Sequence, residues 1–119
     1  MAKDLEKNNI KIILIQTWEA HTKEEWTIGH PNEPEKQQKT LQDRIERCKE
    51  FIEKYGTTYP VFIDKWDNEF ELKFRAWPDK YHFIDNQMKL VQKAEYGTEG
   101  DMDAMVLEDY TILLKRMMQ

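Results

Sequence analysis

The chain has 119 residues, of which 39% are hydrophobic and 34% are charged, enough for one domain with a single core and too few for two. Its net charge of -5 and the lack of a basic stripe interleaved with aromatics exclude nucleic acid as an expected ligand. A mean hydropathy of -0.87 argues against a membrane span. The opening "MAKDLEKNN" resembles neither a secretory signal nor a transit peptide, so we expect an intracellular protein, in the cytoplasm or the mitochondrial matrix, that is not secreted.

The first half of the chain predicts a helix end, a strand, a long loop and a helix. Residues 3–7 are typical of a helix tail, and the β-branched run over residues 10–15 predicts a strand covered on both faces. Residues 22–39 are polar and without a period, which predicts a long loop. Thr40 and Asp43 form a capping box, and Gly56 ends the helix that follows. The apolar stripe of this helix consists of Leu41, Ile45, Cys48, Ile52 and Tyr55.

The second half predicts a strand, a brief helix, a hairpin and a last helix. A strand covers residues 61–63, and Asp67 or Asn68 caps a helix that carries Phe70, Phe74 and Trp77 on one side and ends at Pro78. Residues 81–84 and 90–96 flank "DNQM" and predict an antiparallel hairpin. An acidic lead at residues 101 and 103 opens the last helix. The order is β-α-β-α-Pro-β-β-α, an α/β chain.

Five motifs follow one another at suitable spacings: "EAHTKEEW" at 19–26, "LQDR" at 41–44, "PVFID" at 60–64, "AWPDKYHFI" at 76–84 and "GTEG" at 97–100. With these motifs, the chain resembles the iodothyronine deiodinases and their deiodinase-like relatives. The resemblance covers nearly the whole chain from Ile10 onward. The resemblance implies a thioredoxin-like fold of the peroxiredoxin type. In that fold Pro78 is the candidate cis-proline, a geometry that proline alone adopts at modest cost.

The departures from this family concern its active site. The family's nucleophile, a selenocysteine or cysteine, lies on a turn before the strand that ends in Glu-Ala-His. We expect that segment and its central strand to be missing, so that residues 1–119 form a single, N-terminally truncated thioredoxin-like domain with a mixed sheet. The family's second active-site histidine matches Gln38, and its arginine before the hairpin matches Lys80. Glu19 and His21 remain as a vestigial site, and we expect no catalytic residue, cofactor or metal ion.

Cys48 is the single cysteine of the chain, which excludes an internal disulfide. Its place on the apolar stripe predicts a buried thiol that stays protonated and does not react. We therefore expect Cys48 to be structural and non-catalytic.

His21 has two interpretations. Between Trp18 and Trp26, and two residues from Glu19, its imidazole could act as a general base or bind an aromatic ligand. Without a nucleophile, a structural histidine hydrogen-bonded at the mouth of the sheet is the favoured interpretation. A metal site built from the three histidines fits no standard ligand spacing; these are His21, His30 and His82.

Loss of the central strand would leave unpaired backbone groups on two inner sheet edges. Three repairs are then open: the two edges close up on each other, a second copy pairs with them or swaps in, or a different protein donates a strand or covers the gap. The first hypothesis is a pseudoenzyme: a non-catalytic, deiodinase-like binding or structural subunit of a larger assembly, either a homo-oligomer or a hetero-assembly. The alternative is the C-terminal part of a deiodinase-like or peroxiredoxin-like thiol or selenol oxidoreductase whose nucleophile segment is missing or supplied by another chain. Glu19 and His21 would then orient substrate and assist proton transfer.

Overall fold

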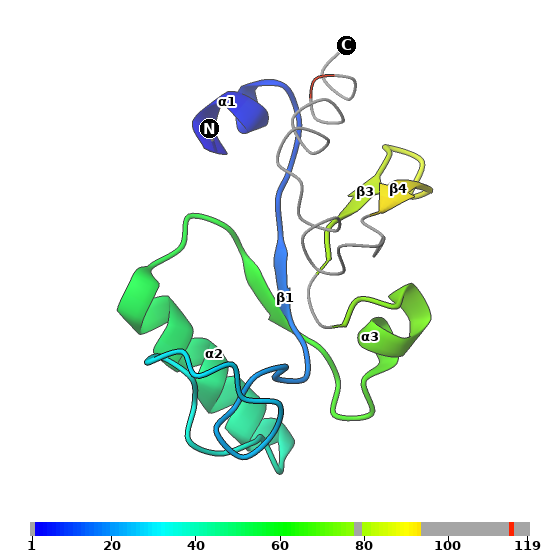
Figure 1. The fold of residues 1–119 in the computed structure, drawn as a ribbon. Helices are drawn as coiled ribbons and strands as arrows, with labels where there is room; N and C mark the ends of the chain where they lie inside the picture. Colours follow the sequence, from blue (N-terminus) through cyan, green and yellow to red (C-terminus); the bar gives the residue numbers. More distant parts are fainter. Residues whose placement is uncertain (1, 78–79, 94–114, 116–119) are drawn as a thin grey trace. The chain divides into compact units, whose positions relative to one another are not determined.

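A computed structural model describes residues 2–77, 80–93 and 115 of the chain, arranged in two compact units. One unit contains residues 12–78 and the other contains residues 1–11 and 79–119. The elements are α1 (Ala2–Lys7), β1 (Leu14–Gln16), α2 (Leu41–Tyr55), β2 (Val61–Ile63), α3 (Glu69–Phe74), β3 (His82–Ile84) and β4 (Leu90–Lys93) (Figure 1). The predicted α/β class is confirmed, with one small parallel and one small antiparallel sheet. A single domain over residues 1–119 stays a prediction.

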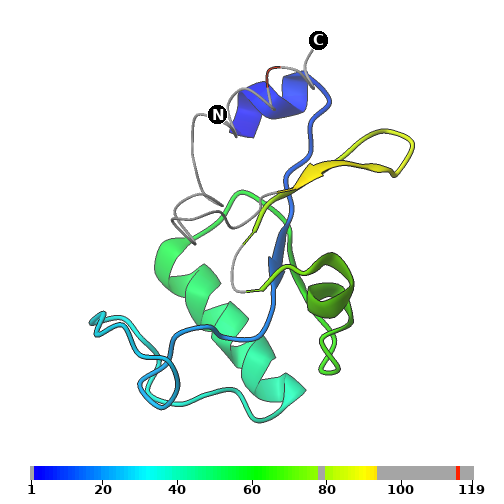
Figure 2. The same cartoon turned by 45° about the vertical axis from the view of Figure 1, so that its right-hand side comes forward.

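The parallel sheet pairs β1 with β2, so that Leu14 lies opposite Val61 and Ile15 lies opposite Phe62. The predicted strand over residues 10–15 is wrong in its bounds, because the ladder begins only where the amide of Leu14 donates to the carbonyl of Pro60 (3.0 Å). Coverage on both faces is also wrong, since Ile13 is 46% exposed. Figures 1 and 2 place α2 and α3 on opposite sides of this strand pair.

Helix α2 begins and ends where the sequence indicates. Thr40 Oγ1 accepts from the Asp43 amide (3.1 Å), and Asp43 Oδ2 accepts from the Thr40 amide (3.0 Å), which confirms the capping box. At the other end, the amide of Gly56, with φ at 66°, donates to the carbonyl of Ile52 (2.8 Å). Glycine adopts this φ without the Cβ clash that other residues meet.

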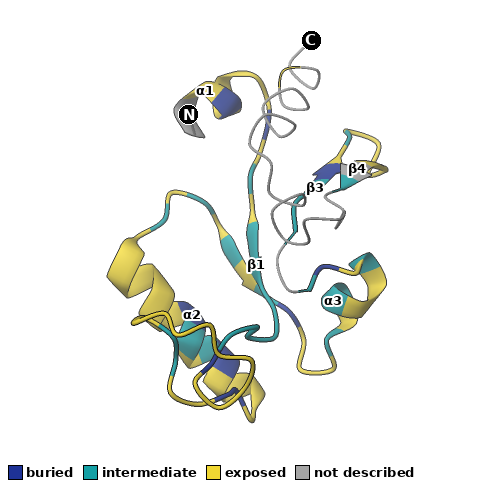
Figure 3. Cartoon of the chain, viewed as in Figure 1, coloured by how far each residue is buried: buried dark blue, intermediate teal, exposed yellow. Residues whose placement is uncertain are grey.

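The buried face of α2 differs from the predicted stripe. Arg44 and Cys48 are buried, whereas Leu41, Ile52 and Tyr55 are exposed (Figure 3). Helix α2 packs on β2, and a helix of this length extends about 22 Å beside a strand of about 10 Å. The ends of the stripe therefore reach beyond the strand.

Helix α3 is shorter than predicted. Asn68 is its N-cap residue, as predicted, but the side chain that binds its first amides is that of Asp64. The helix ends at Phe74, because Arg75 adopts a left-handed conformation with φ at 49°; Trp77 lies beyond it. The carboxylate of Asp64 accepts from the amides at residues 70 and 71 (2.9 Å each), whereas Asp67 accepts only from the amide at residue 69 (3.2 Å). Asn68 makes no side-chain cap. Pro78 lies outside the described residues, so its cis geometry stays a prediction.

The antiparallel hairpin of β3 and β4 confirms the prediction for the residues that are described, with an irregularity between Phe83 and Ile84. Asp85 Oδ1 accepts from the amides of Gln87 and Lys89 (2.9 Å each) and so closes the turn. The "GTEG" motif and the predicted last helix fall outside the described residues, apart from Lys115, which is helical. Within residues 2–77 and 80–93, no helix has the length and apolar character to cross a bilayer.

Asp64→Ala is expected to lower the free energy of unfolding by about 2 kcal/mol, because it removes a buried carboxylate that binds two helix amides. Urea unfolding followed by circular dichroism measures this loss. Asp67→Ala is the matched control: its carboxylate is exposed and accepts one amide, so its cost should stay below about 1 kcal/mol. Equal losses in the two variants would contradict the assignment of Asp64 as the main cap.

Candidate functional site

The two parallel strands end beside each other, and the chain leaves them in two polar segments. After β1 come Trp18, Glu19 and His21, and after β2 come Asp64 and Lys65. In open α/β sheets, ligands and chemistry gather outside the carboxyl ends of parallel strands. This end of the β1–β2 pair is therefore the first candidate site.

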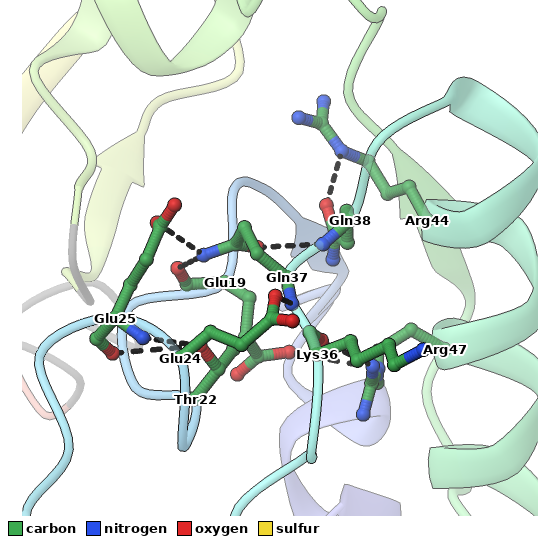
Figure 4. A network of polar contacts seen from close by, with 9 residues as sticks. All are labelled: Glu19, Thr22, Glu24, Glu25, Lys36, Gln37, Gln38, Arg44 and Arg47. Carbon is green, nitrogen blue, oxygen red and sulfur yellow. Dashed lines mark hydrogen bonds and ion pairs between the residues drawn. The ribbon is translucent and has the colours of Figure 1, made fainter.

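Gln37 holds the long loop together at this end (Figure 4). It is buried, and its side-chain Nε2 donates to the carbonyl of Glu19 (2.9 Å) and to Glu25 Oε2 (3.0 Å). Its amide donates to Glu24 Oε2 (3.0 Å), and its Oε1 accepts from the amide of Gln38 (2.9 Å). These hydrogen bonds give the loop a defined conformation, although no periodic pattern in its sequence indicated one.

Thr22 adds a second closure within the same loop. It is fully buried, and its Oγ1 accepts from the amide of Glu25 (2.9 Å) while its own amide donates to the carbonyl of Glu25 (3.0 Å). The turn that results brings the Glu25 carboxylate to Gln37. Buried polar side chains therefore form the interior of this loop.

Arg44 connects the loop to the sheet. This side chain is fully buried, and its Nε donates to Gln38 Oε1 (3.1 Å). Its Nη1 donates to the carbonyls of Asp64 (3.0 Å) and Lys65 (2.8 Å), and its Nη2 donates to Asn68 Oδ1 (2.6 Å). The guanidinium also lies over the ring of Trp66, 5.0 Å from the ring centroid.

The interactions of Arg44 explain the missing cap of Asn68, whose amide oxygen is already bound. Burial lowers the pKa of Arg44, opposed by the carboxylates of Asp64 and Glu71. An arginine remains protonated in proteins, so the side chain carries its charge in the interior. Sequence reasoning missed this role, because arginine in a helix normally lies at the surface.

His21 is half-buried and turned toward its own loop. Its Nδ1 lies 2.8 Å from the carbonyl oxygen of Trp26, and the two rings have centroids 4.4 Å apart. A carbonyl can only accept, so Nδ1 carries the proton and Nε2 is the acceptor in the neutral ring. This arrangement matches the structural interpretation of His21 and also leaves a basic nitrogen on the other side of the ring.

Glu19 is the other residue of the predicted pair. Burial raises the pKa of its carboxyl, while Arg47 and His21 lower it. The Arg47 Nε atom lies 4.0 Å from Glu19 Oε2, and both side chains are about one quarter exposed. The desolvation of Glu19 is thus only partly compensated by its cation.

The remaining predicted positions are divided between the two units. Gln38 is buried, with its Oε1 bound by Arg44, and an amide cannot serve as an acid or base at neutral pH. Lys80 and His82 belong to the unit that holds the hairpin, and His30 accepts from the amide of Asn32 in the loop (3.1 Å). The described residues contain no group of three His, Cys, Asp or Glu side chains suited to a metal ion.

Cys48 lies on α2 and is 4% exposed. Burial raises the pKa of its thiol, so the sulfur stays protonated at neutral pH. A protonated thiol is a poor nucleophile. The only cysteine of the chain is thus unsuited to thiol chemistry in the folded state.

A second candidate site is an apolar groove on the face of the strand pair where α3 lies. Its volume is about 410 Å³. Ile13 and Phe62, which line it, are 46% and 55% exposed. Phe70 and Phe74 of α3 also line the groove and stack with centroids 4.7 Å apart. Its charged lining comprises Asp64, Lys65, Glu69 and Lys73. Sequence reasoning missed this groove, because it predicted a strand covered on both faces.

Arg44→Lys is expected to destabilise the chain by about 2 to 4 kcal/mol, because an ammonium cannot reproduce the planar set of donors that binds four partners. Thermal and urea unfolding measure the loss. Arg47→Lys makes the same change on the same helix at a partly exposed residue and should cost less than about 1 kcal/mol. If Arg44→Lys unfolds like the wild type, Arg44 does not connect the loop to the sheet.

Glu19→Gln is expected to flatten the dependence of stability on pH. The pKa of Glu19 is raised in the folded state above the ordinary value of 4.5, so its protonated form stabilises the fold at low pH. That contribution is lost as the pH rises through the raised pKa. The difference in unfolding free energy between the variant and the wild type should therefore grow in favour of Glu19→Gln over this window. Glu50→Gln, an exposed position on α2, is the control, and identical profiles for all three proteins would exclude the effect.

The function of this site has to be inferred from its residues, because two comparisons with known proteins give no match. A scan of the chain against models of protein families finds no match, and a search of curated proteins finds none either.

Proposed function

We propose that this chain is a deiodinase-like pseudoenzyme with a thioredoxin-like fold, which serves as a non-catalytic binding or structural subunit of a larger protein assembly. The apolar groove carries the proposal. Ile13 and Phe62 place large apolar side chains at the surface of a strand pair, and exposed apolar patches on soluble proteins commonly mark interaction sites. A partner that covers them would gain the free energy of removing them from water.

The edges of the parallel sheet give further support. Among the described residues, β1 and β2 each have one neighbouring strand, namely each other. Parallel strands are normally buried in larger sheets with both faces covered, and a two-stranded sheet alone is marginal. A strand supplied by another polypeptide would extend the sheet, and a supplied helix would cover its exposed face.

The chemistry of the candidate site supports a non-catalytic role. Cys48 is buried with a raised pKa, Gln38 replaces the histidine of the resembled family, and the Nδ1 atom of His21 faces a backbone carbonyl. The polar side chains at the strand ends are committed to holding the loop and α2 in place. These hydrogen bonds stabilise the fold rather than take part in catalysis. The proposed function requires no cofactor.

One observation favours the competing oxidoreductase function. The carboxyl of Glu19 has a raised pKa and lies within electrostatic reach of His21, and acids and bases with shifted pKa values are concentrated at active sites. In that case a thiol or selenol from another segment or chain would supply the nucleophile, and Glu19 and His21 would handle the proton.

Phe62→Gln is expected to abolish assembly without loss of stability. Phe62 is 55% exposed, so the substitution should change the unfolding free energy by less than about 0.5 kcal/mol. Size-exclusion chromatography with light scattering, on the purified chain and on a complex isolated with the wild type, measures the assembled mass. Leu72→Gln is the matched control, because Leu72 is 69% exposed on α3 and does not line the groove.

Two outcomes would overturn the proposed function. One is a wild-type chain that remains a lone monomer at every concentration and in the presence of its native cell extract. The other is reduction of peroxide or release of iodide by the purified chain with a dithiol cosubstrate, when His21→Ala abolishes this activity. The second outcome would establish the oxidoreductase instead.

A further inference from the structure

The long loop after β1 presents two large apolar side chains to solvent. Trp26 is 54% exposed and Ile28 is 62% exposed. The loop is ordered by the hydrogen bonds described above, and the ammonium of Lys54 on α2 also donates to its Asn32 Oδ1 atom (2.9 Å). A partner that covers side chains on an ordered loop loses less conformational entropy than one that must first order it. The two residues are therefore suited to anchor a contact with another molecule.

Trp26 is held at the surface by contacts on its inner side. Its φ of 43° is left-handed, a conformation that bulky residues rarely adopt. The His21 ring donates to its carbonyl (2.8 Å), and the indole packs on the rings of His21 and Trp77, with centroids 4.4 Å and 5.4 Å away. These contacts fix the position of the indole and still leave more than half of the side chain in water.

The carboxylate of Glu33 is fixed on the two residues that follow Trp26. Its Oε2 accepts from Thr27 Oγ1 (2.6 Å) and its Oε1 accepts from the amide of Ile28 (2.6 Å). These hydrogen bonds lower the pKa of Glu33, so the group is ionised at neutral pH. No lysine or arginine of the described residues forms an ion pair with it. Each carboxylate oxygen has a second lone pair for an incoming donor.

The charge of this part of the surface is negative. Residues 23–36 contain four glutamates and two lysines, a net charge of -2 with histidine neutral. The ion pair of Lys23 with Glu35 is already included in this sum. Lys54 brings one further cation from α2 to Asn32, which leaves the balance at -1. A cation is consequently the charge that this loop favours.

We propose that Trp26, Ile28 and Glu33 form a docking site for an arginine of a partner protein. The guanidinium lies on the exposed indole and donates to the Glu33 carboxylate, while an apolar neighbour of the arginine covers Ile28. Arginine fits better than lysine, because its planar group both stacks on an aromatic ring and donates in a fork to a carboxylate. The same chain already shows the first of these contacts, where Arg44 lies 5.0 Å from the ring centroid of Trp66.

This site goes beyond the proposed function of the apolar groove. None of its residues lines the groove, so the two contacts can be tested separately. A partner that binds by this loop is recognised by a basic side chain, whereas the groove was argued from exposed apolar surface alone.

The test uses three capped hexapeptides that differ at one position between leucines: arginine, lysine or citrulline, which is the uncharged counterpart of arginine. Fluorescence anisotropy measures their binding to the full wild-type chain. The arginine peptide is expected to bind about tenfold more tightly than the citrulline peptide at low salt, from one exposed cation–π contact and one exposed ion pair. The lysine peptide should fall between them, and the preference should shrink as salt is added. The indole N–H signal of Trp26 should shift in an NMR titration.

Two variants remove the two contacts separately. Glu33→Gln keeps the shape of the side chain without its charge, and Trp26→Leu keeps an apolar side chain without the aromatic face. Each should lower the preference for arginine over citrulline to about threefold or less. Glu50→Gln makes the same change in net charge as Glu33→Gln at an exposed position on α2, and should keep the tenfold preference. Circular dichroism verifies that all variants are folded.

Equal affinity for the arginine and citrulline peptides would overturn the inference, and so would a full preference in Glu33→Gln. Equal binding of the lysine peptide would overturn the assignment to arginine. Absence of binding by all three peptides would overturn the site, as expected if a second copy of the chain covers the loop. If the peptides fail while Phe62→Gln still abolishes assembly, the proposed function stands without this site. If the arginine preference holds while Phe62→Gln leaves assembly intact, the loop site stands and the role of the groove is wrong.

Discussion

The buried guanidinium of Arg44 is the interaction on which the unit of residues 12–78 depends. It binds the side chain before α2, two carbonyls after β2 and the side chain of Asn68 before α3. A buried cation is costly unless its donors are satisfied. Here backbone and amide oxygens satisfy them, and within the described residues no carboxylate forms an ion pair with it. The interior at the strand ends is therefore polar, and its hydrogen bonds are directional. They set the relative positions of these elements more precisely than apolar contacts alone would.

This polar interior relates the two candidate sites to each other. At the carboxyl ends of the strands, Gln37 and Gln38 continue the contacts of Arg44 into the long loop. On the face where α3 lies, Asp64 holds the start of that helix beside the apolar groove. The residues at the strand ends thus hold both the long loop and the start of α3 in place.

Sequence reasoning succeeded where the signals were local. The capping box at Thr40, the stop at Gly56 and the hairpin all depend on nearby residues with a known conformational preference. It failed where distant residues decide the structure. The bounds of β1 depend on its partner strand, and the side chain that binds the first amides of α3 is that of Asp64, at the end of β2, rather than Asp67 or Asn68. It also missed a local feature, the left-handed Arg75 that ends α3 early. The alternation of residues could not reveal that one sheet face is exposed, because apolar strand residues look the same whether or not a helix covers them.

The contacts of Arg44 also bear on how this unit unfolds. Its partners lie 6, 20, 21 and 24 positions away along the chain, so one side chain closes several large loops at once. Loop closure has an entropic cost that must be met before such contacts form. Helix α2, the strand ends and the start of α3 should consequently lose their amide protection against hydrogen exchange together, as one cooperative foldon rather than element by element.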